Sequence, residues 1–415
     1  MYEYKTLSNG IRVVAEKIPY LRSVSMGVWV GNGSRHENAS ENGISHFIEH
    51  MLFKGTSRRS ASEIASEIDG IGGQINAFTA REYTCFYTKT LDTHADIAAD
   101  VLSDILFGSL LTERDMELER RVIGEEISLY EDSPEDLVYD LLYETIWPGM
   151  PMGRSILGTP ESLAAVTPEL MRSYMESHYR SGNTVIAVSG NYDEGLFDML
   201  EKYFGSRSIG HGKPDISEAV YTPGRAFKTK DIEQVQLVAA FRGIDIFDEG
   251  VYSLLTFNNV FGSGMSSRLF QNIREKKGLV YSIGAGHSAY IGTGIFDISA
   301  GMSPENLAYV AELIAEEIHE VKKNKLSRAE VERAKEQLKG SYILSYESTG
   351  ARIQGAGRSL LLDKPIYTCD EALEKIDSVT ADSVAEIIDR ILDVSSLSVA
   401  AVGALDNIDG IFGNL

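Results

Sequence analysis

The sequence has few cysteines, no long apolar run and far fewer basic than acidic residues. Its two cysteines, Cys85 and Cys369, lie far apart without the spacing of metal ligands, so we expect reduced thiols rather than a disulfide framework. No stretch approaches the length of a membrane span, and the N-terminus lacks the basic and apolar regions of a secretory signal. The formal net charge of -22 argues against nucleic acid as a partner, because phosphates would be repelled. We therefore expect a soluble, cytoplasmic protein that binds no membrane, unless a targeting peptide has been removed.

The length of 415 residues, 43% of them hydrophobic, suffices for two or three domains with sizeable cores. An internal repeat favours two, because residues 166–190 align without a gap on residues 379–403. Both segments read Val-Thr, an apolar helix pattern and a Val-rich strand that ends on Gly, although chance could produce such a likeness. A stretch rich in Gly, Pro, Ser and charge, residues 206–226, has the composition of an inter-domain linker. We predict an α+β fold of two homologous domains, each a mostly antiparallel β-sheet with helices packed on it, with these boundaries: N-terminal domain 1–210, linker 211–225, C-terminal domain 226–415.

One predicted helix carries the strongest chemical signal. It begins after Asn42 as a plausible N-cap and stops before Gly55. Residues four apart share a helix face, so His46 and His50 point to the same side, and Glu49 lies beside them. The order H-x-x-E-H is the inverzincin signature, the reverse of the common zinc-protease spelling. The alternative is an amphipathic helix whose two histidines simply face solvent.

A catalytic zinc ion needs a third protein ligand and one open position for water. Glu126 is the best candidate, because its predicted helix also carries Glu119 two turns earlier on roughly the same face. A buried strip of carboxylates is costly unless it meets a cation or a metal ion. Glu-rich helices are common, however, and Glu125 could equally point outward, so spacing alone leaves this ligand open. In the second half, the apolar segment 254–260 stands where the first half has its motif helix, so we expect metal binding in the first half only.

With these residues in place, the sequence resembles the pitrilysin, or insulinase, family of zinc peptidases. The likeness rests on the H-x-x-E-H motif, on Glu119 and Glu126, and on four flanking segments: Gly43-Ile-Ser-His46, Phe53-Lys-Gly-Thr56, Gly73-Gln-Ile-Asn-Ala-Phe-Thr79 and Arg120-Arg-Val-Ile-Gly-Glu-Glu126. It covers nearly the whole chain, and residues 265–281 look most like the processing-peptidase branch, including bacterial relatives of the mitochondrial β subunit. The resemblance implies a metalloendopeptidase that hydrolyses peptides or unfolded segments inside a chamber.

The resemblance also implies a role for each matching residue of the first half. His46, His50 and Glu126 would bind Zn²⁺. Glu49 would be the general base that takes a proton from the attacking water and passes it to the leaving amine. Glu119 would be a further catalytic-site carboxylate that supports the metal centre from behind.

Other implied roles concern the substrate. Arg274 and Tyr281 would lie over the substrate backbone near the scissile bond, although an ordinary surface Arg and a strand Tyr fit the same pattern. An edge strand would bind an extended peptide by main-chain pairing, and it consists of Asn76, Ala77, Phe78 and Thr79. A plain hairpin strand is the alternative for the same residues. Pairing of this kind predicts loose sequence specificity.

Partner and alternative functions follow from the same resemblance. In related processing peptidases two chains close the chamber, and a single chain with both the zinc helix and the Arg274/Tyr281 pair suits a homodimer. A different class of function is a non-catalytic structural or partner subunit of this fold, like core subunits of respiratory complexes. The complete set of zinc residues argues against it, and a purely structural zinc site would favour Cys ligands. The sequence does not distinguish presequence removal from general peptide degradation.

Overall fold

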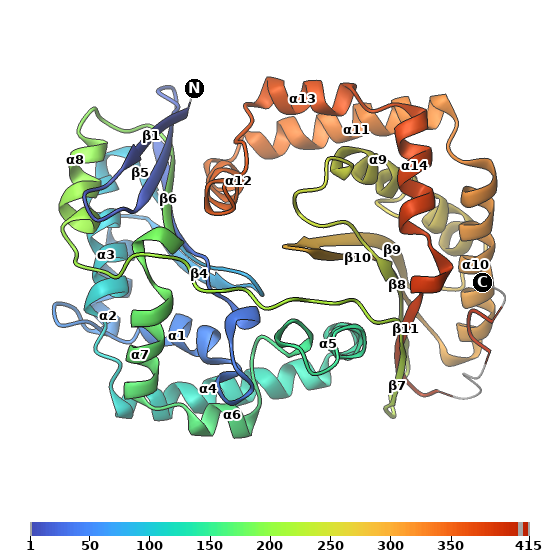
Figure 1. The fold of residues 1–415 in the computed structure, drawn as a ribbon, viewed down its shortest axis with the longest axis horizontal. Coiled ribbons are helices and arrows are strands. Elements are labelled where there is room, and N and C mark those ends of the chain that lie inside the picture. Colours follow the sequence, from blue (N-terminus) through green and yellow to red (C-terminus); the bar gives the residue numbers. More distant parts are fainter. Residues whose placement is uncertain (1, 406–409, 414–415) are drawn as a thin grey trace. The chain divides into compact units, whose positions relative to one another are not determined.

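The computed structural model describes residues 2–405 and 410–413, and these residues form two compact units (Figure 1). The first unit contains the residues up to Ile127 together with Arg154–Ser217 and Leu344–Thr368. The second contains Ser128–Gly153, Glu218–Ile343 and the residues from Cys369 onward. The outer ends of the two predicted domains, residues 1 and 415, lie outside the described residues.

The sheet of the first unit has every neighbouring pair antiparallel except β2 and β6, which are parallel. Its strands lie in the order β1 (Tyr2–Thr6), β2 (Arg12–Lys17), β6 (Thr184–Gly190), β3 (Ser23–Val30), β5 (Thr84–Leu91) and β4 (Gln74–Thr79). The central strands β3 and β6 are rich in Val and buried almost throughout, as expected for strands covered on both faces. Strand β4 forms one edge and is only half-buried.

Helices cover both faces of this first sheet. One face carries α1 (Ile44–Leu52), α2 (Ala61–Gly70), α3 (Ala95–Gly108), α7 (Pro168–His178) and α8 (Leu196–Leu200), whose apolar side chains form one core with the strands. The other face is covered by α12 (Thr349–Leu361), which packs against Trp29 and is drawn in orange-red beside β6 in Figure 1. The remaining helices of this part of the chain are α4 (Glu113–Asp132), whose last residues belong to the second unit, and α6 (Pro160–Ala165).

The sheet of the second unit repeats this plan. Its strands lie in the order β7 (Arg225–Thr229), β11 (Ser398–Gly403), β8 (Val235–Arg242), β10 (Thr293–Met302) and β9 (Ser282–Tyr290), with β7 and β11 parallel and the other pairs antiparallel. One face packs on α5 (Pro134–Ile146) and the other on a core shared with α9 (Val251–Phe261), α10 (Leu307–Asn324) and α14 (Ala381–Ile391). The unit also contains α11 (Arg328–Tyr346), which ends in the first unit, α13 (Cys369–Asp377) and the short π-helix η7 (Phe270–Glu275).

The internal repeat predicted from the sequence corresponds to equivalent elements of the two units. Helix α7 and strand β6 match α14 and β11 at the predicted offset, and Thr167 and Thr380 cap the two helices with their side chains. Both strands end on a glycine with positive φ, +133° at Gly190 and +148° at Gly403. Together with the shared strand order, this confirms the predicted α+β fold with two similar, mostly antiparallel sheets.

The sequence predicts two contiguous domains joined by a linker at 211–225, whereas each compact unit also contains a segment from the other side of that linker. Helix α5, which precedes that linker, packs on the second sheet, and α12, which follows it, packs on the first. In each case a buried apolar face decides the partner: Val138 and Leu142 of α5 join one core, and Ile353 of α12 joins the other. No helix or strand lies between 206 and 224, in keeping with a linker there.

Two smaller expectations concern cysteines and membranes. Neither Cys85 nor Cys369 is part of a disulfide; the first is buried and the second partly exposed. Among the described residues, no helix is both long enough and apolar enough to span a bilayer.

Candidate metal centre

The helix that carries the motif, α1, is fixed by an apolar face and by an unusual N-terminus. Its apolar side chains are buried in the core of the first unit: Ile44, Phe47, Ile48, Met51 and Leu52. The N-cap is Gly43 rather than the predicted Asn42, and its φ of +89° favours glycine. A Cβ at Gly43 would lie only 2.6 Å from the carbonyl oxygen of Leu157. The prediction of Asn42 as N-cap was therefore wrong.

The three predicted metal ligands converge on one point. Glu126 Oε2 lies 3.6 Å from His46 Nε2 and 3.7 Å from His50 Nε2. One ligand atom from each residue lies within 4.8 Å of the others, and no second group of three such residues occurs in the described part of the chain. These separations are too long for hydrogen bonds. Two ligand atoms about 2.1 Å from a tetrahedral zinc ion lie about 3.4 Å apart, so the donor set fits such an ion.

The protonation state of His46 also suits metal binding. Burial, and secondarily the charge of His50, lowers the pKa of His46 to about 3. His46 is therefore neutral near pH 7 and keeps a lone pair for a ligand. Its Nδ1 atom is buried and finds no hydrogen-bond partner among the described residues, so the ring is held by packing rather than by an acceptor.

Glu119 contacts the ring nitrogen of His50 that points away from the other two candidate ligands. Its Oε2 atom lies 3.1 Å from His50 Nδ1, while its Oε1 atom lies 2.7 Å from Lys54 Nζ. Glu119 is only 5% exposed, and Lys54 is the cation that makes its burial tolerable. A carboxylate on the outer nitrogen of a metal-binding histidine fixes the tautomer and orientation of the ring. The sequence predicts a partly buried acidic strip here, and Glu119 is buried while the Glu126 side chain is 33% exposed.

Glu49 lies on the same helix, next to the histidines, with its carboxylate tied to the edge strand. The hydroxyl of Thr79 donates a hydrogen bond of 2.5 Å to Glu49 Oε2. Burial raises the pKa of Glu49, while the bond from Thr79 and the charge of His50 act in the opposite direction. A half-buried carboxylate with a fixed orientation and increased proton affinity is what general-base chemistry requires.

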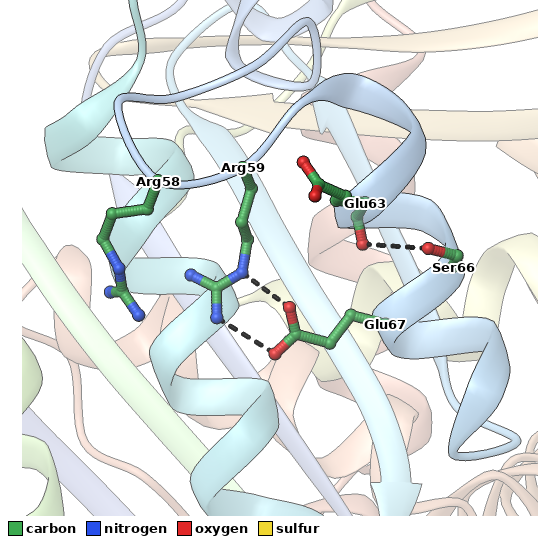
Figure 2. A pocket seen from close by; sticks show the side chains of 5 residues that line it. All are labelled: Arg58, Arg59, Glu63, Ser66 and Glu67. Carbon is green, nitrogen blue, oxygen red and sulfur yellow. Dashed lines mark hydrogen bonds and ion pairs between the residues drawn. The ribbon is translucent and has the colours of Figure 1, made fainter.

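The loop after α1 is anchored by a charged network. Thr56 donates a hydrogen bond to Asp104 (2.8 Å), and Arg59 contacts both Asp104 (2.8 Å) and Glu67 (2.7 and 3.0 Å). Figure 2 shows the Arg59–Glu67 pair in a surface pocket of about 340 Å³, lined by Arg58, Arg59, Glu63, Ser66 and Glu67. Arg58 and Arg59 bond to Asp100 and Asp104 of α3, and Arg59 also bonds to Glu67 of α2, so the network ties the loop after α1 to these two helices.

The remaining predicted site residues are those of strand β4, Arg274 and Tyr281. Strand β4 is the edge strand that the sequence predicts, and in the described residues it pairs with β5 alone. Its other side is therefore an edge of the sheet, where the N–H of Ala77 donates to Asn76 Oδ1 (2.8 Å). Arg274 lies in η7 with its guanidinium 4.7 Å from the Phe270 ring centroid, and Tyr281 is 60% exposed just before β9. Both belong to the second unit, and their role at the substrate stays a prediction.

Sequence reasoning missed two parts of the centre. Lys54 follows His50 by four residues, but it lies beyond the end of α1 at Leu52, so helix spacing does not predict its contact with Glu119. The contact from Thr79 to Glu49 joins residues 30 apart in sequence, and no local pattern predicts it.

Comparison with known proteins identifies what the chain is similar to. Residues 12–160 match the profile described as Insulinase (Peptidase family M16), and residues 165–338 match the one described as Peptidase M16 inactive domain. A Bacillus subtilis protein named uncharacterized zinc protease YmxG is 42% identical over 384 residues, with 92% of this chain and 94% of that protein covered. An uncharacterized zinc protease of Rickettsia felis is 35% identical, with 97% of each chain covered.

Solved structures show the same fold. A protease from Helicobacter pylori superposes with a TM-score of 0.92 at 20% identity, covering 97% of this chain and 99% of that one. A Pseudomonas fluorescens protein described as a peptidase M16 inactive domain superposes with a TM-score of 0.91 at 17% identity, covering 98% of each chain. The matches extend over both units.

Proposed function

Because this chain belongs to the insulinase family of peptidases, family M16, we propose that it is a zinc-dependent endopeptidase that hydrolyses peptides or unfolded segments of proteins. Family membership supports peptidase activity in general. The names of the relatives from Bacillus subtilis and Rickettsia felis support zinc as the metal. The observation that carries the proposal is the convergence of His46, His50 and Glu126 beside Glu49.

His46, His50 and Glu126 would hold the metal ion, in the two-nitrogen, one-oxygen donor set of catalytic zinc sites. A zinc ion there supplies Lewis acidity toward a water molecule and toward the peptide carbonyl. Glu119 keeps the outer nitrogen of His50 occupied, so that Nε2 of the ring faces the centre.

Glu49 would act as the general base and then as the general acid. Its carboxylate takes a proton from the attacking water and delivers it to the amine that leaves. The hydrogen bond from Thr79 holds the carboxylate in one orientation during both transfers. Since Thr79 ends the edge strand β4, a peptide paired with β4 would pass next to Glu49.

Further features of the proposal remain predictions from the sequence. They are the enclosing chamber, the contribution of Arg274 and Tyr281, the homodimer, the cytoplasmic location and the likeness to the processing-peptidase branch. The alternative of a non-catalytic subunit is less compatible with the site. A scaffold needs neither converging ligand atoms nor a separate carboxylate oriented by Thr79.

Matched substitutions on one helix test the proposal. Glu126→Ala should abolish stoichiometric zinc and peptide cleavage, whereas Glu125→Ala, whose side chain is exposed one residue earlier, should retain both. Metal analysis gives the zinc content, and mass spectrometry of a digested peptide library gives the cleavage products. Equal zinc and equal cleavage in the two variants would refute the ligand assignment. The same library would show whether a basic residue near the cut is preferred, as expected for a processing enzyme.

A further inference from the structure

The N-terminus of α1 lacks a cap of its own. Its N-cap residue, Gly43, has no side chain, so the first N–H groups of the helix need an acceptor from elsewhere. Glu37 supplies it. One carboxylate oxygen accepts hydrogen bonds from Gly43 N (2.7 Å) and Asn42 Nδ2 (3.1 Å), and the other accepts from Ser45 N (2.9 Å).

The burial of Glu37 makes this contact costly in isolation. The residue is 1% exposed, and among the described residues its carboxylate accepts from backbone N–H groups and the Asn42 amide rather than from a Lys or Arg side chain. A buried carboxylate without a cation is strongly disfavoured unless fixed dipoles compensate it. Here the compensation comes from the backbone N–H groups and the positive end of α1. Both oxygens of Glu37 thus serve as acceptors for N–H groups at the start of α1, which Gly43 itself does not cap.

The contact reaches the metal centre through one residue. Ser45, whose N–H binds Glu37, directly precedes His46, and its hydroxyl lies 3.2 Å from Asn32 Nδ2 and 3.3 Å from the Tyr174 hydroxyl. His46 stands in the first turn of α1, where an uncapped helix frays, while His50 lies a full turn further on. His50 also has Glu119 behind it, whereas His46 Nδ1 finds no acceptor among the described residues.

We infer that Glu37 is a positioning residue of the metal centre, which holds His46 in place by capping the first turn of α1. The inference rests on the proposed zinc site, because what Glu37 positions is a ligand of that metal. It concerns a residue that contacts neither the metal ion nor the substrate.

Glu37→Gln is the direct test, because the amide keeps the shape but loses the charge and turns an NH₂ group toward one of the two backbone donors. The zinc dissociation constant of the purified full-length chain, from competition with a chromophoric chelator, should rise about 10–100-fold. The absorption spectrum of the Co²⁺-substituted protein should also change, since it reports the arrangement of the ligands. Both quantities describe the folded protein and do not depend on the fraction that folds.

Asp297→Asn is the matched control. Asp297 is another buried carboxylate, 5% exposed, which accepts a hydrogen bond of 2.8 Å from Tyr139 in the second unit. The control should lose stability while it retains the zinc affinity and the Co²⁺ spectrum of the wild type.

A wild-type dissociation constant together with a wild-type Co²⁺ spectrum in Glu37→Gln would overturn the inference. If Glu37→Gln does not fold, Glu37→Asp is tested instead, because Asp retains the carboxylate on a side chain that is one methylene shorter. It should bind zinc more weakly than the wild type, and an unchanged affinity and spectrum would again overturn the inference. If the wild type itself binds no zinc, the proposed function fails; if the wild type binds zinc and the variants bind it equally, only the role of Glu37 fails.

Discussion

Replacement of Thr79 by Val tests how the edge strand serves the catalytic carboxylate. The sequence assigns Thr79 to substrate binding through its main chain, whereas the structure adds a 2.5 Å hydrogen bond from its hydroxyl to Glu49. Val has nearly the same shape and the same β-branched preference for a strand, so Thr79→Val removes the hydroxyl and leaves the backbone of β4 unchanged. The substitution therefore separates the two roles.

The magnitude follows from the strength of the bond. A hydrogen bond to a charged group contributes about 1.5–3 kcal/mol, which corresponds to a factor of about 10–150 in rate if it is all lost in the transition state. Since Thr79 is half-buried and water can replace part of the bond, we expect a fall in kcat of about tenfold. KM should stay near the wild-type value, because the main chain that binds substrate is intact.

The assay is steady-state cleavage of a fluorogenic peptide, with zinc content measured on the same samples. Thr79→Ser, which keeps the hydroxyl, is the control and should retain most of the activity. Unchanged kcat in Thr79→Val at full zinc occupancy would refute the orienting role. A rise in KM alone would instead favour side-chain contact with the substrate.

Three further predictions concern the second unit, a buried ion pair and acid stability. Tyr281→Phe should leave zinc content unchanged and lower kcat by about 10²-fold if the hydroxyl reaches the oxyanion, so unaltered kinetics would exclude that role. Glu82→Gln should lower the free energy of unfolding in urea by about 3 kcal/mol, because Glu82 pairs with Arg35, which is 2.6 Å away and 2% exposed. As the control, Glu117→Gln at an exposed ion pair should lower it by under about 1 kcal/mol. Equal losses in the two variants would contradict this account. Burial lowers the pKa of His36 from 6.5 to about 4, so its contribution to stability is present above pH 6.5 and is lost as the pH falls toward 4. His36→Asn should flatten urea-derived stability over that pH window, and a slope equal to that of the wild type would disprove the assignment.

The fold and the placing of the two motif histidines side by side could be predicted from the sequence, because local spacing encodes them, whereas spacing alone left Glu126 open. His46 and His50 share a helix face by their separation of four, and the S-x-x-E order of Ser60 and Glu63 is a capping-box signature that the structure shows at the start of α2. The internal repeat of a helix followed by a strand is also a local pattern, and it predicted that the two sheets share one architecture.

The rest depended on contacts between distant segments. Asn42 has the composition of an N-cap, but its amide donates to Glu37 (3.1 Å) and to the carbonyl of Ser155 (2.9 Å), and Gly43 takes the cap position. Helix α12 packs on the first sheet through its buried apolar face, and Gly357 lies so close to Trp29, over 300 residues away in the chain, that a Cβ there would clash with the ring. Local propensity carries no information about such packing.

The central claim is that metal held by α1 and α4 acts together with Glu49 in peptide hydrolysis. Its most direct test is a zinc titration of the chelator-stripped protein, with peptide cleavage and bound metal followed in parallel for the wild type and Glu49→Gln. The account predicts that wild-type activity rises to a plateau at about one equivalent of zinc, while Glu49→Gln binds the same equivalent and turns over at least about 10³-fold more slowly. Cleavage by the stripped wild type without added metal, or wild-type turnover by zinc-loaded Glu49→Gln, would contradict it.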